Sequence, residues 1–154
     1  MPSKCRKSDK NSRVIVPADC AYTSEIINGK RVVMKLPIPY CEGFDATYPT
    51  NTENESRDYF YRTDDKKNKY IAYLDKDGYG LLQTSTSLLK GRKLFVWGQG
   101  EGAKHWKDFL SETDKGDYVE IQAGLARSQY EHIPMQPKTA WEWIELYGPM
   151  QCKP

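Results

Sequence analysis

The sequence lacks several features that would point directly to a function. It has no apolar run near twenty residues and no apolar signal-peptide segment, so neither a membrane span nor secretion is indicated. Its two histidines are His105 and His132, and no two cysteines form a C-x-x-C pair, so a zinc site is not expected. The cysteines are Cys5, Cys20, Cys41 and Cys152. We therefore expect a cytoplasmic protein with reduced thiols, no metal or cofactor and no membrane contact.

Neither sign of charge dominates the chain. Its 23 Lys and Arg residues against 21 Asp and Glu residues leave a net charge of +2, and beyond Arg13 the two signs are interspersed. This distribution excludes the basic footprint of a nucleic-acid-binding protein. A short basic cluster at 4–10 belongs to the segment 1–12, which we expect to be flexible.

Short β-branched and aromatic runs bounded by turn residues predict a mainly β fold. Asn28-Gly29 and Asp77-Gly78 are strong hairpin signals, between strands near 25–27 and 31–36 and between strands near 69–75 and 79–86. Further strands are predicted at 13–17, 92–97, 117–124, 129–133 and 141–147. The segment 37–68 reads as a long loop with one short strand at 59–61. We expect one antiparallel β-sandwich domain over 13–150 and a tail at 151–154.

One short helix is predicted near 102–111. His105, Trp106, Phe109 and Leu110 form a single apolar stripe along it, so this face should pack on a sheet. The preceding segment 98–102 has the spacing G-x-G-x-G and no surrounding βαβ unit, which does not match a dinucleotide-binding loop.

The strand at 117–124 is the centre of the predicted site. Strict alternation places Tyr118, Glu120 and Gln122 on one face and the apolar residues between them on the other. Carboxylate, amide and aromatic groups on one face suit a sugar, whose hydroxyls need donors and acceptors and whose C–H face stacks on aromatic rings. We predict that the ligand-binding residues are Trp97, Gln99, Glu120, Gln122, Arg127 and Gln129.

The four tryptophans are candidate stacking platforms. Trp97 is the best placed, because it precedes the glycine-rich loop 98–102. Trp106 is expected in the core through the helix stripe, and Trp141 and Trp143, two residues apart on one strand, are expected to pack inward.

Four segments together resemble a family of uncharacterised bacterial domains often joined to tetratricopeptide repeats. They are Arg13-Val-Ile-Val-Pro-Ala18, Lys69-Tyr-Ile-Ala-Tyr-Leu-Asp-Lys-Asp-Gly-Tyr-Gly80, Gly91-Arg-Lys-Leu-Phe-Val-Trp-Gly98 and Tyr118-Val-Glu-Ile-Gln-Ala-Gly124. That family is similar to galactose-mutarotase-like proteins, which bind sugars in the cleft of a β-supersandwich. The resemblance implies that this chain corresponds to the C-terminal part of such a fold.

Catalysis is a weaker hypothesis. Glu120 and His132 are the candidate acid/base residues, with Glu131 as an alternative partner, since proton transfer at an anomeric centre needs two titratable groups. In epimerases the general base is a Glu three residues before a His-aromatic-Pro run, which His132-Ile-Pro134 resembles. That alignment places Gln129, which cannot accept a proton, at the base position.

Three functions remain open. The first is a carbohydrate-binding domain. The second is an interaction module, completed by another chain or by a second copy, because a partial supersandwich leaves sheet edges unpaired. The third is a sugar-processing enzyme using Glu120.

Overall fold

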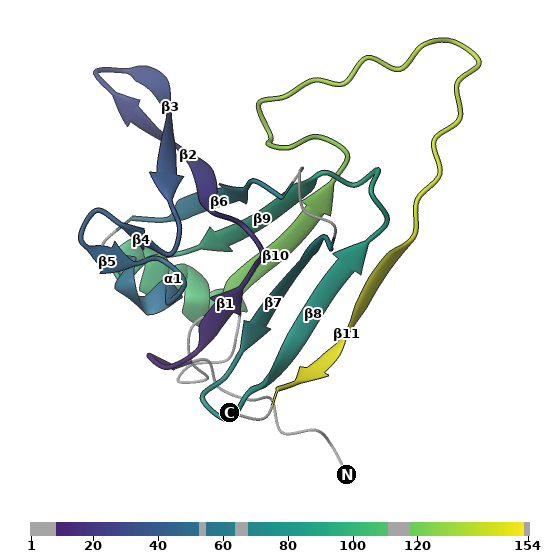
Figure 1. Cartoon of the computed structure of the whole chain (residues 1–154). Coiled ribbons are helices and arrows are strands. Elements are labelled where there is room, and N and C mark those ends of the chain that lie inside the picture. Colours follow the sequence, from purple (N-terminus) through teal and green to yellow (C-terminus); the bar gives the residue numbers. More distant parts are fainter. Residues whose placement is uncertain (1–8, 53–54, 64–67, 111–117, 153–154) are drawn as a thin grey trace.

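The computed structural model describes residues 9–52, 55–63, 68–110 and 118–152. Within them the chain forms eleven strands, one α-helix and one 3-10 helix, so the predicted mainly β class is confirmed (Figure 1). The helices are α1 (Glu101–Leu110) and η1 (Pro49–Asn51). The strands are β1 (Arg13–Ile15), β2 (Cys20–Ile27), β3 (Lys30–Pro37), β4 (Tyr40–Cys41), β5 (Phe44–Asp45), β6 (Arg57–Tyr61), β7 (Tyr70–Leu74), β8 (Tyr79–Ser85), β9 (Gly91–Val96), β10 (Val119–Gly124) and β11 (Glu145–Gln151).

Two antiparallel sheets form the body of the molecule. One has four strands in the order β1-β7-β8-β11, and the other has five in the order β10-β9-β6-β2-β3. A separate ribbon pairs β4 with β5. The strand order is non-consecutive in both large sheets, so residues distant in sequence become cross-strand neighbours.

Both predicted hairpin turns are present. Ile27 pairs with Lys30 across Asn28 and Gly29, whose φ angles of 51° and 74° match a turn that needs positive φ at both positions. In the β7–β8 hairpin the Asp75 carboxylate accepts hydrogen bonds from the backbone N–H groups of Asp77 and Tyr79, each at 2.9 Å. Local sequence therefore determines these two connections.

The hydrophobic core lies between the two large sheets. It combines Val14 of β1 and Ile71 of β7 with Tyr59, Tyr61, Leu94 and Val96 of the five-stranded sheet. Tyr59 and Tyr61 stack with their ring centroids 6.2 Å apart. Burial raises the pKa of the Tyr61 hydroxyl far above its ordinary value. Side chains from both sheets thus share one core.

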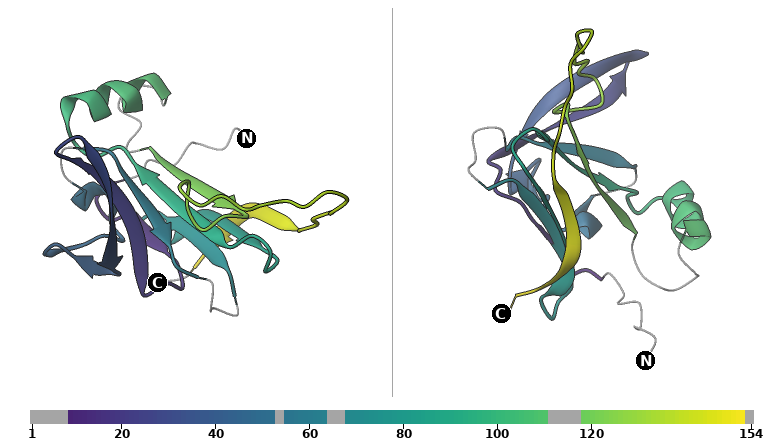
Figure 2. Two further views of the ribbon diagram at one scale, coloured as in Figure 1. Left: turned by 90° about the horizontal axis from the view of Figure 1, so that it is seen from above. Right: turned by 90° about the vertical axis from the view of Figure 1, so that its right-hand side faces the viewer.

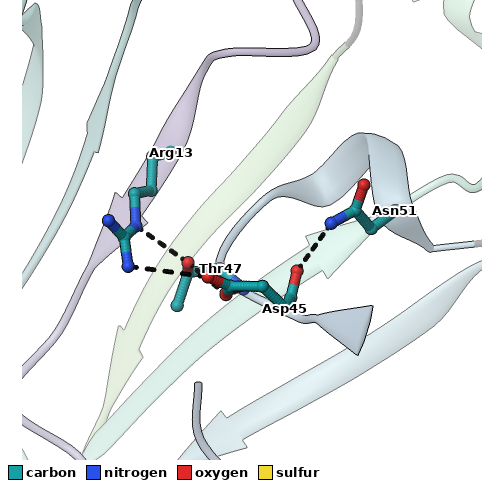
Figure 3. Close-up of polar contacts among 4 residues, drawn as sticks. All are labelled: Arg13, Asp45, Thr47 and Asn51. Carbon is teal, nitrogen blue, oxygen red and sulfur yellow. Dashed lines mark hydrogen bonds and ion pairs between the residues drawn. The ribbon is translucent and has the colours of Figure 1, made fainter. Parts of the chain in front are cut away.

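The segment 37–68 is more ordered than predicted. It contains β4, β5, η1 and the five-residue strand β6, and only 53–54 and 64–67 lie outside the described residues. Figure 3 shows how this segment is fixed to β1: Arg13 Nε donates to Thr47 Oγ1 at 2.9 Å and its Nη2 lies 3.6 Å from Asp45 Oδ2. Asn51 Nδ2 donates to the Asp45 carbonyl at 3.0 Å. These polar contacts explain why a stretch without apolar periodicity is ordered.

Two predicted strands near the C-terminus are wrong. Residues 129–133 form a turn and irregular backbone, and the predicted strand 141–147 lies later, as β11 (Glu145–Gln151). The apolar run around Trp141 therefore precedes the paired strand. Trp143 is 44% exposed, so the expected inward packing of Trp141 and Trp143 as a strand pair is also wrong.

The apolar stripe of the helix is not buried. Trp106 is 47% and Phe109 74% exposed, whereas Ala103 and Lys107 are the buried residues of α1. Lys107 Nζ donates to the Gly98 carbonyl at 3.0 Å, which orients the opposite side of the helix toward the body. The prediction that the stripe packs on a sheet, and that Trp106 lies in the core, is therefore wrong. Figure 2 shows α1 at the periphery of the molecule.

A long connection joins β10 to β11. It extends outward from the body as the green-to-yellow loop of Figure 1. Its first residues, 125–131, fold back against the five-stranded sheet through Tyr130, whose ring meets Phe60 edge-on at 5.6 Å. The rest of the connection is largely exposed. We call residues 125–131 the overhanging turn.

Candidate functional site

The outer face of the five-stranded sheet is the face turned away from the core. Strand register sets its side chains in two rows, one running through Gln122, Lys93, Phe60 and Tyr22, the other through Glu120, Phe95 and Asp58. The alternation predicted for β10 is consistent with this arrangement, because Val119 and Ile121 pack on the core. Gln122 Nε2 donates to Glu120 Oε2 at 3.2 Å along the same strand.

Lys93 is the central cation of this face. Only 9% of the residue is exposed, and its Nζ lies 2.8 Å from Asp58 Oδ1. The same ammonium lies 5.6 Å from the ring centroid of Phe60 and 5.5 Å from that of Phe95. An ion pair and two cation–π contacts hold the charge in one place. The centre of the face is therefore a rigid, mixed polar and aromatic surface.

The overhanging turn forms one wall of the site. The Arg127 backbone N–H donates to Glu131 Oε2 at 2.6 Å, and Arg127 Nη1 donates to Oε1 at 2.9 Å. The backbone hydrogen bond from Arg127 lowers the pKa of Glu131, and the charges of Arg127 and Arg62 act in the same direction. Glu131 is thus a stable carboxylate that closes the turn.

Tyr130 connects this turn to the hairpin of β2 and β3. Its hydroxyl oxygen lies 2.6 Å from Ser24 Oγ, and Arg31 Nη1 donates to both oxygens. The Arg31 guanidinium also lies 5.2 Å from the Tyr130 ring centroid. Tyr130 therefore reaches from Phe60, on the outer face of the sheet, to Ser24 and Arg31 of the β2–β3 hairpin.

Gly91 allows the turn to approach β9 closely. A Cβ atom at this position would collide with the Ala126 backbone carbonyl oxygen. Only glycine leaves room for the backbone of the turn at the start of β9. The position of the turn therefore depends on this residue.

Two adjoining surface cavities lie between the turn and the sheet. The larger, about 370 Å³, is lined by Tyr22, Val33, Phe60, Arg62, Arg127, Ser128, Tyr130 and Glu131. The smaller, about 220 Å³, is lined by residues 122–129 together with Phe60, Gly91, Arg92 and Lys93. Both are bordered by Phe60, Arg127 and Ser128, so we treat them as one composite site. Phe60, only 2% exposed, forms its floor.

Three of the predicted binding residues meet at this composite site. Gln122, Arg127 and Gln129 line the smaller cavity, and Arg127 also lines the larger. Glu120 lines neither cavity, although its carboxylate accepts the hydrogen bond from Gln122. It is placed to orient that amide.

Trp97 and Gln99 lie at the opposite end of the sheet. Val96 pairs with Val119 at the start of β10, whereas Gly91 pairs with Gly124 beside the turn. The Trp97 ring stacks on Trp106 of α1 with centroids 5.9 Å apart and meets Phe95 edge-on at 4.7 Å. Gln99 Oε1 accepts from Lys107 Nζ at 3.4 Å. Both residues thus contact the helix or its lysine, and neither lines the composite site.

The catalytic candidates do not converge in the structure. Glu131 lines the larger cavity, whereas His132 is exposed and lines neither cavity. No acid/base pair of Glu120 and His132 is formed.

A larger hollow of about 760 Å³ lies elsewhere, beside β6 and the β2–β3 hairpin. Its carboxylates are Glu25, Glu42 and Glu55. Arg57 extends between two of them, with Nη2 2.9 Å from Glu25 and Nη1 2.7 Å from Glu42. Because this arginine ties the wall groups to one another, the hollow is less suited to a ligand than the composite site.

A comparison with family models gives one match. Residues 12–141 match the family described as a domain of unknown function (DUF5107). The chain belongs to this family. The predicted resemblance to an uncharacterised domain family is thereby confirmed. Searches of curated proteins and of solved structures each gave no match.

Other kinds of site are not found in this DUF5107 chain within the part that the structure describes. There, no three His, Cys, Asp or Glu side chains gather closely enough to hold a metal ion. Nor does any described helix have the length and apolar character needed to cross a membrane. The cysteines at 20, 41 and 152 are free thiols.

The sequence interpretation missed the residues from β2 and β6. Phe60 alternates with Tyr59 and Tyr61, and Lys93 alternates with Leu94, so period-two reading alone assigns both to the face opposite the core. Sequence could not reveal that β6 and β10 flank β9, which brings Phe60 and Gln122 to either side of Lys93.

Proposed function

We propose that this protein is a carbohydrate-binding domain whose saccharide occupies the composite site. The observation that carries the proposal is the pair of adjoining cavities sharing Phe60, Arg127 and Ser128. Amide, hydroxyl, guanidinium and aromatic groups from the sheet and from the overhanging turn converge there. Chain segments separated by about a hundred positions contribute to one surface.

Saccharides suit these groups chemically. Ring hydroxyls need several donors and acceptors in fixed positions, which Gln122, Gln129 and Ser128 offer. The C–H face of a sugar needs aromatic surface, which Tyr22 and Tyr130 offer at the walls above Phe60. The larger cavity falls within the usual range for small-ligand sites, roughly 300–1,000 Å³.

The site supports recognition rather than turnover. Hydrogen bonds from Arg127 hold Glu131 in its ionised form, so it is not a general acid. The Glu120 carboxylate accepts a hydrogen bond from the Gln122 amide and lies outside both cavities. The one carboxylate that lines the composite site, Glu131, has both oxygens bound by Arg127 and a lowered pKa, which makes it a weak base.

Saturation-transfer NMR over a panel of neutral and charged mono- and oligosaccharides tests the proposal. We expect contact with at least one saccharide. Its affinity should fall about fivefold or more in Tyr130→Ala, because this change removes an aromatic wall of the cavity and its contacts with the β2–β3 hairpin. Tyr40→Ala is the matched control, since this exposed tyrosine lies on β4 outside the site. Absence of contact across the panel would contradict carbohydrate binding.

The wider resemblance agrees with this proposal. We infer that the two sheets correspond to part of a galactose-mutarotase-like supersandwich and that relatives are joined to tetratricopeptide repeats. In such an arrangement a sugar-binding sheet face would be presented beside a protein-binding repeat. A cytoplasmic location is part of the same proposal.

An interaction module is the second candidate, and strand β11 favours it. On either side of β11, Ile144 O accepts a hydrogen bond from Thr86 N and Cys152 N donates one to Gly78 O. The backbone N–H and C=O groups of even-numbered residues in β11 therefore point toward β8, and those of odd-numbered residues point outward. Leu146 and Tyr147 are exposed beside this free edge. A second copy could pair there antiparallel, but Pro149 at an outward position offers no N–H. Light scattering tests pairing with a second copy: a strict monomer at high concentration rejects that form of the candidate and leaves only pairing with a different chain.

A further inference from the structure

A continuous series of aromatic contacts leads away from the composite site along the outer face of the sheet. Phe60, at the floor of the site, and Phe95 lie against the same Lys93 ammonium, which is 5.6 and 5.5 Å from their ring centroids. Phe95 meets Trp97 edge-on at 4.7 Å, and Trp97 stacks on Trp106 of α1 at 5.9 Å. These contacts connect the site to the helix.

The helix end of this series is exposed. Trp106 meets Phe109 edge-on at 5.8 Å, and the two residues are 47% and 74% exposed. Their stripe faces outward because the buried Lys107 on the opposite side donates to the Gly98 carbonyl at 3.0 Å. Figure 2 shows α1 beside β10, on the side away from β11 and therefore on the outer side of the five-stranded sheet. We define the aromatic track as the rings of Phe60, Phe95, Trp97, Trp106 and Phe109.

Polar groups flank the aromatic track between its two ends. Strand register places Glu120 on one side of Phe95 and Asp58 on the other. Both acidic residues are partly exposed. Carboxylate oxygens accept hydrogen bonds from sugar hydroxyls, and aromatic rings contact the C–H faces of sugars. The surface between the composite site and α1 therefore offers the same combination of groups as the site itself.

We propose that the ligand is an oligosaccharide, with one end in the composite site and its further rings along the aromatic track as far as Trp106 and Phe109. From Lys93 to Trp97 the backbone covers about 13 Å, at roughly 3.3 Å per residue, which is longer than one sugar ring. A single sugar therefore cannot contact both ends. This inference rests on the proposed function, since it extends the same site to a second contact region.

Oligosaccharides of increasing length test the proposal. Isothermal titration of the full chain with cello-, xylo-, malto- and manno-oligosaccharides of two to six rings measures how affinity depends on length. In at least one series we expect the longest member to bind about tenfold or more tightly than the disaccharide. The reason is that contacts at α1 add to those in the composite site within one ligand molecule.

Matched tryptophan variants locate the added contacts. Trp106→Ala should reduce the ratio of longest-member to disaccharide affinity to about threefold or less. Trp143→Ala is the control, because Trp143 is similarly exposed, at 44%, and lies outside the aromatic track and both cavities. It should leave the ratio unchanged. If Trp106→Ala is poorly folded, Phe109→Ala serves instead and should reduce the ratio about twofold or more.

The outcomes separate this inference from the proposed function. Affinity that does not rise with length, or a ratio that is equal in the wild type and Trp106→Ala, overturns the role of the track and leaves carbohydrate binding at the composite site intact. Binding of none of these oligosaccharides also overturns it, whereas contact with another saccharide by NMR would still support the proposed function. Self-association in light scattering that is lost in Phe109→Ala overturns it in favour of a protein contact at α1.

Discussion

Lys93 shows how a single residue can organise a sheet face. Its charge is nearly buried and is compensated by Asp58 and by the rings of Phe60 and Phe95. Removing one partner of such a pair leaves the other charge uncompensated where water cannot solvate it, which lowers folding stability. The pair should therefore be coupled in folding stability.

A double-mutant cycle measures this coupling. Asp58→Asn should lower the free energy of unfolding by about 1–3 kcal/mol, because the Lys93 ammonium keeps only its cation–π contacts. Adding Lys93→Met should recover part of the loss. Asp77→Asn is the control, since the Lys76–Asp77 pair is exposed, and it should leave the urea midpoint unchanged. Strictly additive effects of Asp58→Asn and Lys93→Met would contradict the coupling.

Tyr147 should make stability depend on alkaline pH. Partial desolvation of its hydroxyl, together with the hydrogen bond and charge of the neighbouring Glu145 carboxylate, raises the pKa of this half-exposed tyrosine to about 12. The unfolded chain loses this proton near pH 10 and the folded chain near pH 12, so the unfolded state binds fewer protons in between. Stability from Tyr147 is present below pH 10 and is lost as the pH rises to about 12.

Chemical denaturation across this window tests Tyr147. The free energy of unfolding of Tyr147→Phe should fall less steeply with rising pH than that of the wild type. Buried Tyr61 should cause some decline in both proteins. Glu145→Gln should lower the pKa of Tyr147, as followed by NMR of carbon-labelled tyrosine. Superimposable pH profiles for wild type and Tyr147→Phe would reject the assignment.

At the scale of elements, α1 reverses the usual relation between polarity and burial. Lys107→Met should lower the free energy of unfolding by about 1–3 kcal/mol, because the stem still packs but the hydrogen bond to Gly98 is lost. Phe109→Ala should change it by less than about 0.5 kcal/mol, since that side chain is exposed. Thermal unfolding of both variants gives the comparison.

Lys104→Met is the matched control on the same helix, because Lys104 is exposed. It should leave the unfolding midpoint unchanged. A greater loss in Phe109→Ala than in Lys107→Met would mean that the apolar stripe is buried in solution.

The same helix shows what sequence patterns can predict. Hairpin turns and the alternation of β10 depend on local backbone chemistry, so Asn28-Gly29 and the opposite orientations of Glu120 and Ile121 are read correctly from the sequence. The direction in which an amphipathic helix faces depends on what surrounds it. The Gly98 carbonyl that binds Lys107 has no signature in the helical periodicity.

Strand order limits how much of the site could be predicted from the sequence. Gln122, Arg127 and Gln129 could be predicted because β10 and its turn are contiguous in sequence. Phe60 of β6, and Arg62 just after it, reach the composite site only because β6 pairs with β9, whose paired residues lie 31 to 39 positions further along the chain. Such a long-range pairing is selected by the core as a whole rather than by any local run.

For the whole molecule, the composite site depends on a core shared by both sheets. Tyr59, Leu94 and Val96 hold the five-stranded sheet against Val14 and Ile71 of the other. The outer face gains its rigidity from this packing, since each strand that carries a site residue also carries a core residue. A substitution that destabilises the core should therefore destabilise the site and both sheets together.

Leu94→Ala tests this cooperativity. Leu94 is fully buried on β9, so its truncation should cost about 2–5 kcal/mol. The equivalent truncation Leu146→Ala, at a side chain 54% exposed on β11, should cost less than about 1 kcal/mol. Hydrogen exchange of Leu94→Ala should show amides of β7 and β9 losing protection by similar factors, because one core links their sheets. Loss confined to the five-stranded sheet would instead show that the two sheets unfold as separate units.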